Sequence, residues 1–351
     1  MASEPRDSGL SLSSFFTRCH LPIDARGQCD EFVTARFPGL DIRPAPFQGY
    51  CSYTLFVGES TIVQFRPVEH CINIDIVREA CAIFGALVPE VKLLGIMPDN
   101  NKLHVFCMRR LNGVSLTDFR ASTRRQTDAA KLHRRQTPSM EARAHKDQVQ
   151  RMGTVGLTLQ WRLEMVASTL PERFRRLTTR LLPALPSIDG LPWTLSHGDF
   201  LPSNILVDRQ TGETSGLLDW AEAEWLPFGV GMYGLEELLG EVRSGQFTYY
   251  PEADKLRSLF WSEIKSQIHE LRGSPCQLRA VREAQLLGVL LWHAIAFDDG
   301  RLDRVVEEGT DDGEIQRLDA FLLNYKPGSK ASVSRFSFPS LLSSLLLLSR
   351  G

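Results

Sequence analysis

The sequence predicts an α+β fold in which a small strand-rich part precedes a larger, mainly helical part. Two patterns predict it. Short β-branched and aromatic runs separated by turns make residues 42–108 strand-rich, and several segments with apolar residues at helical spacing follow from residue 109 onward. The composition agrees, because 43% of the 351 residues are hydrophobic and 23% are charged, as in ordinary globular proteins. Disordered and collagen-like classes are therefore excluded.

The strand-rich part begins with a predicted hairpin, because two extended runs flank a Gly-Glu-Ser turn. Isoleucine, valine, cysteine and phenylalanine side chains then recur at helical spacing, which predicts one amphipathic helix. Two further apolar runs predict two more strands. The expected elements are, in order, strands at 52–57 and 61–66, a helix at about 74–87, and strands at 91–95 and 103–108.

The helical part is expected to span 109–327, and the flanking segments are expected to lie outside the two main parts. Residues 1–41 form an N-terminal extension that is partly helical, and residues 328–351 form a Ser/Leu-rich, low-complexity tail. A basic insertion at about 120–151 holds nine Lys or Arg against three acids, which indicates a solvated helix or insertion more than an anionic partner. Helices are expected at 161–182, 235–239, 253–271 and 278–297.

Charge and cysteine usage limit the partners and the compartment. With 40 basic and 42 acidic residues the net charge is −2, so no overall field attracts nucleic acid or an anionic membrane, and neither partner is predicted. No run of 18 apolar residues predicts a membrane-spanning helix. Seven cysteines without C-x-x-C spacing indicate free thiols in a reducing, cytoplasmic setting. The oligomeric state is not predicted.

The segment from Ser196 to Trp220 carries the chemistry. Asn204 precedes a short apolar strand, a turn follows, and Asp219 ends the returning strand. Because an antiparallel hairpin brings its two open ends together, we expect Asn204 and Asp219 to lie side by side, with Asp199 five residues upstream. Hard oxygen ligands of this kind suit Mg²⁺, which shares its shell with substrate phosphates.

This pattern resembles the catalytic core of the protein-kinase-like fold. The Gly after His197 and the Asp-Trp pair at Asp219 look like the aminoglycoside phosphotransferase family, and in particular its fungal type. The resemblance implies a two-lobed fold with residues 42–108 as the nucleotide-binding N-lobe. It also implies that Asp199 is the catalytic base, that Asn204 and Asp219 hold Mg²⁺, and that His197 orients the loop.

The same resemblance implies where the N-lobe holds ATP. Gly49 and Ser52 occupy the phosphate loop, although one glycine is far fewer than in protein kinases. Arg66 ends the next strand where a lysine is missing, and Glu79 of the helix is its expected partner. The linker at Met108 would bind adenine through its backbone. The alternatives are a plain hairpin entry and solvated surface charges, and ATP is not distinguished from GTP.

The expected acceptor is a hydroxyl of a small molecule, so the predicted enzyme is a small-molecule kinase. Protein kinases typically have a lysine where this chain has Leu201, and no Ala-Pro-Glu segment follows. Acids after the motif would favour a cationic or polyhydroxylated acceptor, unless they are merely solvated: Glu222, Glu224, Glu236 and Glu237. Two alternatives stay open, namely a catalytically inactive kinase-like nucleotide-binding module and a metal-dependent hydrolase, which would need more histidines.

Overall fold

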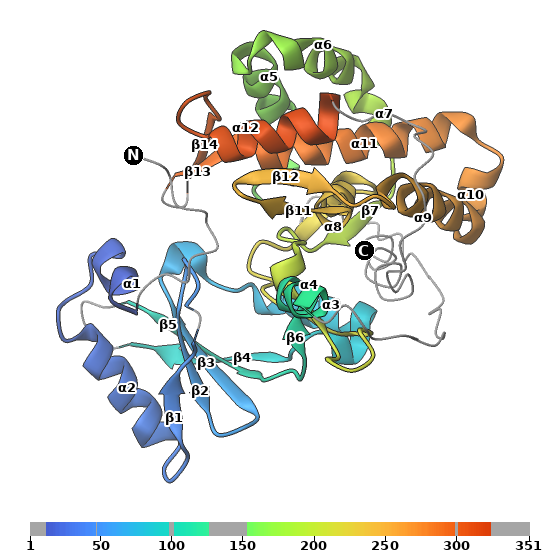
Figure 1. Ribbon diagram of the computed structural model, residues 1–351. Coiled ribbons are helices and arrows are strands. Elements are labelled where there is room, and N and C mark those ends of the chain that lie inside the picture. The colour runs from blue at the N-terminus through green and yellow to red at the C-terminus, as the bar shows by residue number, and fades with distance from the viewer. Residues whose placement is uncertain (1–11, 47, 98–101, 126–152, 299–300, 324–351) are drawn as a thin grey trace. The chain divides into compact units, whose positions relative to one another are not determined.

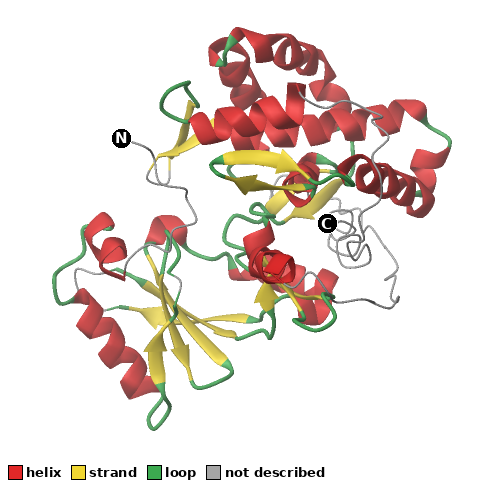
Figure 2. Ribbon diagram, in the orientation of Figure 1, coloured by secondary structure: helices red, strands yellow, loops and turns green. Residues whose placement is uncertain are grey.

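The computed structural model describes residues 12–46, 48–97, 102–125, 153–298 and 301–323 (Figure 1). The chain divides into two compact units. The first comprises residues 1–112 and 215–221, and the second comprises residues 113–214 and 222–351. The first unit is built on a sheet and the second is mainly helical, so the predicted α+β fold is confirmed (Figure 2).

A five-stranded antiparallel sheet forms the body of the first unit, in the order β1-β2-β3-β5-β4. The hairpin of β2 and β3 pairs Thr54 with Gln64, and β3 also pairs along its length with β5. All four predicted strands are confirmed to within one or two residues at their ends. The strands are β1 (Ile42–Pro44), β2 (Tyr53–Val57), β3 (Thr61–Arg66), β4 (Val91–Ile96) and β5 (His104–Arg109).

The two faces of this sheet differ in polarity because successive strand residues point to opposite sides. Helices α1 (Leu12–Arg18) and α2 (Ala25–Arg36) contribute to the apolar core on one face. The prediction that residues 1–41 lie outside the strand-rich part is therefore wrong for these two helices, because their apolar side chains are buried in its core. That core includes Phe15, Phe16, Cys29, Val33, Tyr53, Leu55, Val57, Val63, Phe65 and Val105. The alternate positions of β2 and β3 put Thr54, Gln64 and Arg66 on the other face, which is therefore the face available for polar chemistry.

The predicted helix at 74–87 forms as α3 (Ile74–Phe84), followed by a 3₁₀ turn over Gly85–Leu87. Asn73 begins it, because its side-chain oxygen accepts the backbone N–H groups of Asp75 and Ile76. Gly85 ends it with a φ of +61°, a backbone conformation that favours glycine. Side-chain periodicity alone continues through this stop, which explains the overlong prediction.

The second unit is mainly helical (Figure 2). Its longest helix, α11, begins after Ser274, whose hydroxyl caps the N–H of Gln277, and nearly half of its residues are buried. The helices are α4 (Leu116–Arg125), α5 (Leu159–Thr169), α6 (Glu172–Leu181), α7 (Leu185–Asp189), α8 (Gly234–Leu238), α9 (Ala253–Gln267), α10 (His269–Arg272), α11 (Pro275–His293) and α12 (Asp312–Leu318). Short 3₁₀ turns lie at 156–158, 182–184, 202–204 and 230–233, and a π-helical turn lies at 319–323.

Short strands are interspersed among these helices, and they pair locally as antiparallel ladders. They are β6 (Val114–Ser115) with β8 (Ile205–Val207), β7 (Trp193–Ser196) with β10 (Glu224–Pro227), β11 (Gly240–Arg243) with β12 (Gln246–Tyr249), and β13 (Ile295–Asp298) with β14 (Arg301–Val305). The predicted helix 278–297 is wrong at its end, because residues 295–297 lie in β13. Their apolar run fits a strand as well as a buried helix.

The division into units departs from chain order at one place. Ser215–Ala221, which the sequence prediction includes in the helical part 109–327, belongs to the first unit, and β9 (Thr214–Leu217) enters that unit at Ser215. Most of the basic insertion at 120–151 and the whole tail at 328–351 lie outside the described residues. No helix within the described ranges is both long enough and apolar enough to cross a membrane.

Candidate active site

The loop that follows β7 in the second unit holds the first half of the predicted site. Strand β7 pairs with β10, which fixes Ser196 opposite Glu224. Gly198 then turns the chain with a φ of +78°, and a Cβ atom at this position would lie 2.0 Å from the backbone oxygen of Glu222. Only glycine fits both the left-handed conformation and this close approach. The glycine of the His-Gly-Asp motif is therefore required by local packing.

Hydrogen bonds fix the three polar side chains of this loop. The backbone N–H of Asp199 donates to Nδ1 of His197 at 3.2 Å. Asn204 Nδ2 donates to both the backbone oxygen and the Oδ2 atom of Asp199, at 2.9 and 2.6 Å. Because both of these partners are acceptors, the amide nitrogen of Asn204 must face Asp199. Its amide oxygen is then the atom suited to a metal ion.

The second half of the predicted site lies in the first unit. Asp219 adopts a φ of +58°, an uncommon conformation for a residue other than glycine, and such strain is frequent at functional sites. Trp220 follows it and is buried, with its ring 5.4 Å from that of Phe84 on α3. Arg66 Nη2 donates to Oδ1 of Asp219 at 3.1 Å, although the Asp219 side chain is 45% exposed.

A row of hydrogen-bonded side chains connects Arg66 with the predicted phosphate loop. Arg66 Nε donates to Gln64 Oε1 at 3.0 Å, and Gln64 Nε2 donates to the Thr54 hydroxyl at 3.3 Å. The hydroxyls of Thr54 and Ser52 lie 3.1 Å apart. Gln48 closes the loop, because its side-chain amide both accepts the N–H of Thr54 and donates to its carbonyl oxygen. The loop is therefore shaped by side chains rather than by many glycines.

The structure brings some predicted residues together and leaves other pairings untested. Arg66 bonds to Gln64, to the carbonyl oxygen of His70 and to Asp219, so its pairing with Glu79 on α3 stays a prediction. Met108 lies in β5, between Ile62 of β3 and Val91 of β4. Gly49 approaches Ser52, since a Cβ atom there would lie 3.4 Å from the Ser52 hydroxyl.

The acids that follow the motif are largely used inside the second unit. Glu224 is buried and accepts the backbone N–H groups of Val155 and Gly156, and burial raises the pKa of its carboxyl. Glu236 binds the buried guanidinium of Arg257 through both oxygens. Glu237 lies 3.0 Å from Arg317 Nε. These three carboxylates stabilise the fold, so the idea that they gather around a cationic acceptor loses its support.

Sequence reasoning missed three contributors. Thr54 acts through the register of β2 against β3, which strand alternation partly encodes, and Gln48 acts through its side-chain hydrogen bonds with the Thr54 backbone. The ring of Tyr233 packs in the core, and its hydroxyl oxygen accepts the backbone N–H of Phe200, the residue after Asp199. Tyr233 and Phe200 are 33 positions apart in the chain. A tyrosine that far along the chain carries no local signal of this contact.

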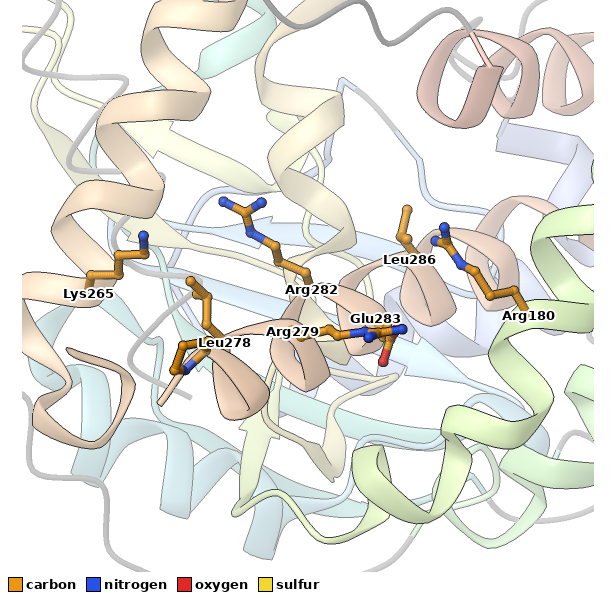
Figure 3. Close-up of a pocket in the computed structure, with 8 residues that line it drawn as sticks. Arg180, Lys265, Leu278, Arg279, Arg282, Glu283 and Leu286 are labelled. Carbon is orange, nitrogen blue, oxygen red and sulfur yellow. The ribbon is translucent and has the colours of Figure 1, made fainter. Parts of the chain in front are cut away.

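A separate surface cavity of about 580 Å³ lies among α6, α9 and α11 of the second unit (Figure 3). Leucine side chains and one proline form part of its lining, together with one carboxylate and four cations: Arg180, Lys265, Arg279 and Arg282. None of the residues that the motif predicts to be functional lines it. The cavity is therefore not part of the candidate active site.

The oxygen atoms that the motif offers suit Mg²⁺, but they do not make up a complete set of protein ligands around a metal ion. Among the described residues, no group of three or more His, Cys, Asp or Glu side chains is arranged to hold a metal ion. The motif instead offers one amide oxygen, from Asn204, and one carboxylate, from Asp219. Mg²⁺ is usually held by one or two protein oxygens together with phosphates and water.

Comparisons with known proteins agree with the motif. Residues 59–230 match the model of the phosphotransferase enzyme family. A curated relative, the uncharacterized protein YcbJ of Bacillus subtilis (strain 168), is 30% identical over 81 residues, which is 23% of this chain and 26% of that protein. The match thus spans about a quarter of the relative's length. The family model therefore agrees with the family predicted from the motif over residues 59–230, a little under half of the chain.

Solved structures with a similar chain path are aminoglycoside phosphotransferases. The crystal structure of aminoglycoside phosphotransferase APH(4)-Ia is 19% identical, with 76% of this chain and 90% of that chain covered and a TM-score of 0.41. The GDP complex of aminoglycoside 2'-phosphotransferase-IIIa is 13% identical, with 74% and 87% covered and a TM-score of 0.45.

Proposed function

We propose that this chain is an ATP-dependent phosphotransferase that moves the γ-phosphoryl group of ATP to a hydroxyl of a small molecule. The observation that carries the proposal is the set His197, Asp199, Asn204 and Asp219 at the family's spacing, inside the segment that matches the phosphotransferase family. Each of these residues is held by local contacts of its own unit. If these residues only formed turns, position 198 would not need to be glycine for steric reasons. Nor would the Asn204 side chain need to donate its hydrogen bonds to Asp199.

In the second unit, Asp199 is the proposed base. Its carboxylate accepts the proton of the attacking hydroxyl, while Asn204 Nδ2 fixes the orientation of the carboxylate through its 2.6 Å bond to Oδ2. His197 supports the loop, since its Nδ1 accepts the N–H of Asp199. The imidazole is thereby a positioning group and not a reacting group. The amide oxygen of Asn204 is left for the metal ion.

In the first unit, Asp219 and Arg66 are the proposed partners of Mg²⁺ and the nucleotide phosphates. Mg²⁺, when bound, neutralises the charge that develops on the transferred phosphoryl group. Arg66 is a planar, permanently charged donor, suited to bidentate phosphate contacts. We propose further that backbone N–H groups near Gly49 and Ser52 cover the phosphates, that the Met108 backbone meets adenine, and that Glu79 supports the cation.

The proposed acceptor is a small molecule, because Leu201 replaces the lysine that protein kinases typically use. Aminoglycoside-like sugars, amino alcohols and hydroxylated secondary metabolites all fit this chemistry. Because Glu224, Glu236 and Glu237 are bonded internally, we do not require a cationic acceptor. Uncharged polyhydroxylated molecules belong in the test on equal terms.

An inactive nucleotide-binding module is the second candidate, and two observations favour it. The phosphate loop has a single glycine, and Arg66 stands where a lysine is usual. Such a module would bind Mg·ATP without turnover. The hydrolase alternative needs a multi-ligand metal centre, and no such cluster occurs among the residues the structure describes.

A panel of hydroxylated small molecules, scored for ADP release in the presence of Mg·ATP, tests the proposal. A phosphotransferase gives acceptor-dependent ADP release and a phosphorylated product of matching mass. Binding of Mg·ATP without turnover on any acceptor would favour the inactive module. ADP release that depends on a folded protein acceptor would overturn the proposed substrate class.

A further inference from the structure

The peptide bond between Asp199 and Phe200 is held at both of its polar atoms. Its carbonyl oxygen accepts Asn204 Nδ2 at 2.9 Å and the N–H of Leu201 at 3.0 Å. Its N–H, on Phe200, donates to the hydroxyl oxygen of Tyr233 at 2.7 Å. Phe200 and Tyr233 are each only 3% exposed, so water does not replace this bond. A buried amide proton that loses its acceptor is left unpaired at considerable cost.

The Tyr233 hydroxyl is placed by contacts with α11. The Tyr233 ring stacks on the ring of Trp292, with 4.5 Å between centroids and 14° between planes. Gln285 Nε2 donates to the backbone oxygen of Met232 at 3.3 Å, which fixes the neighbouring turn. Burial, together with the charge of Asp199, raises the pKa of the phenol well above its usual value, so the group stays neutral and its oxygen remains a normal acceptor.

Two glycines on either side of Tyr233 allow this turn to touch the catalytic loop. A Cβ atom at Gly234 would lie 2.6 Å from the Phe200 carbonyl oxygen, and one at Gly231 would lie 2.4 Å from the Ser196 hydroxyl. Contacts therefore reach both ends of the segment 196–200 that contains Asp199. Within this turn, the Tyr233 hydroxyl makes the hydrogen bond to the catalytic loop, at Phe200, the residue directly after Asp199.

We propose that Tyr233 is a positioning residue for phosphoryl transfer, whose hydroxyl holds the Asp199–Phe200 peptide plane and thereby the direction of the Asp199 carboxylate. This inference rests on the proposed role of Asp199 as the base. It adds to that role a residue that makes no contact with the reacting atoms. Tyr233 lies in the second unit and its contacts include none of the residues proposed for ATP, so it acts on turnover and not on nucleotide affinity.

The test compares Tyr233→Phe with the matched control Tyr249→Phe. Both changes remove one hydroxyl and keep the ring, and the Tyr249 hydroxyl donates to Glu236 at the same distance, 2.7 Å, but does not meet the catalytic loop. Steady-state ADP release over a range of Mg·ATP concentrations gives kcat and the KM for ATP, with water as acceptor where the panel offers none. Hydrogen exchange at the Phe200 amide is measured on the same proteins.

For Tyr233→Phe we expect kcat to fall about 10-fold at an unchanged KM for ATP, since misplacing a reacting group by ~1 Å can cost up to about 10²-fold. Exchange of the Phe200 amide should accelerate. Tyr249→Phe should leave kcat and this amide as in the unchanged protein. A Tyr233→Phe enzyme with unchanged kcat, or a control that loses as much, would overturn the inference.

Failure of the proposed function is distinguishable from failure of the inference. A wild-type protein that transfers phosphate from ATP neither to any acceptor nor to water would contradict the proposed function. Hydrogen exchange at Phe200 would then be the remaining test of whether the Tyr233 hydroxyl holds the loop. Faster exchange at Phe200 only in Tyr233→Phe supports the role of the hydroxyl in holding the loop. Equal exchange in both variants contradicts it.

Discussion

At the scale of single residues, the buried guanidinium of Arg66 is the most informative group. Its side chain is 3% exposed, and a buried charge is tolerated only with hydrogen-bond partners and an opposite charge. Arg66 has both, through Gln64, the His70 carbonyl and Asp219. The polar face of the sheet therefore presents a fixed cation beside the carboxylate proposed for Mg²⁺.

Replacing Arg66 by Ala should raise the KM for ATP by about tenfold, equivalent to ~1.4 kcal/mol, because the phosphates lose a charged donor. Arg66→Lys should recover only part of the loss, since an ammonium group cannot reproduce the planar fork. The control is Arg78→Ala, an exposed arginine of α3 paired with exposed Asp75. Steady-state kinetics on the three variants make the comparison. An Arg66→Ala enzyme with the KM of Arg78→Ala would contradict the assignment.

The cysteines give a residue-scale prediction that is independent of the site. Cys29 is fully buried, whereas Cys276 is exposed. Burial raises the pKa of the Cys29 thiol to about 12, so at neutral pH it stays protonated, and the thiolate is the reactive form. Iodoacetamide followed by peptide mass spectrometry should modify Cys276 first and Cys29 last. Unfolding in denaturant should remove the difference; equal rates in the native protein would contradict the core described for the first unit.

At the scale of elements, the loop from Ser196 to Asn204 depends on the glycine that turns it. Gly198 has a φ of +78° and no room for a Cβ atom, whereas Gly58 has a φ of +55° with nothing within 4 Å of that position. The two glycines share the conformational requirement and differ in the steric one. They therefore separate the cost of the left-handed backbone from the cost of the contact.

Gly198→Ala should destabilise the protein more than Gly58→Ala does. The left-handed conformation alone costs an alanine ~1–2 kcal/mol, and at Gly198 the contact with the Glu222 backbone adds to it. We expect a lower thermal midpoint and lower kcat for Gly198→Ala, and full kcat for Gly58→Ala. Thermal denaturation and ADP release measure both. Equal losses in the two variants would show that the close approach at Gly198 has no consequence.

Local patterns predicted the elements that local forces determine. The hairpin of β2 and β3 and the helix α3 follow from alternation, a short turn and an Asn cap, all within a few residues. Predictions failed where distant partners decide. Tyr233 reaches Phe200 across 33 residues. The error at residues 295–297 has another cause, since these residues pair in a local hairpin with Arg301–Val305 and their apolar run fits a helix as well as a strand. The contact between Asp199 and Asn204 was predictable, because they lie only five residues apart in the chain.

At the scale of the whole molecule, the residues that the motif predicts to be functional belong to two different units. Asp199 and Asn204 belong to the second unit, whereas Asp219 belongs to the first and is bonded to Arg66 there. Chain order does not predict this, since residues 215–221 follow the catalytic loop in sequence. The proposed roles divide accordingly, with the base in the second unit and the nucleotide phosphates in the first.

The effect of Mg²⁺ on ATP binding tests whether Asp219, and not Asp199, is needed to bind the nucleotide. ATP with Mg²⁺ should raise the thermal midpoint, because a ligand at about 100 times its Kd stabilises the native state by ~2.7 kcal/mol. Chelation with EDTA should remove most of the shift. Asp219→Asn should remove it as well, whereas Asp199→Asn should keep it. A full shift with ATP in EDTA would contradict the proposed metal ligands.

The most direct measurement of the central proposal is transfer of the labelled γ-phosphoryl group of ATP to a hydroxylated small molecule by the wild type, Asp199→Asn and Asp208→Asn. Asp208 is an exposed turn carboxylate of the same segment, whose pKa is lowered by hydrogen bonds from the backbone N–H groups of Thr211 and Gln210, and serves as the matched control. We predict labelled product with the wild type and Asp208→Asn, and a rate about 10²–10⁴-fold lower with Asp199→Asn. Equal rates for all three proteins would contradict the assignment of Asp199 as the base. Label found only on a protein acceptor would contradict the proposed substrate class.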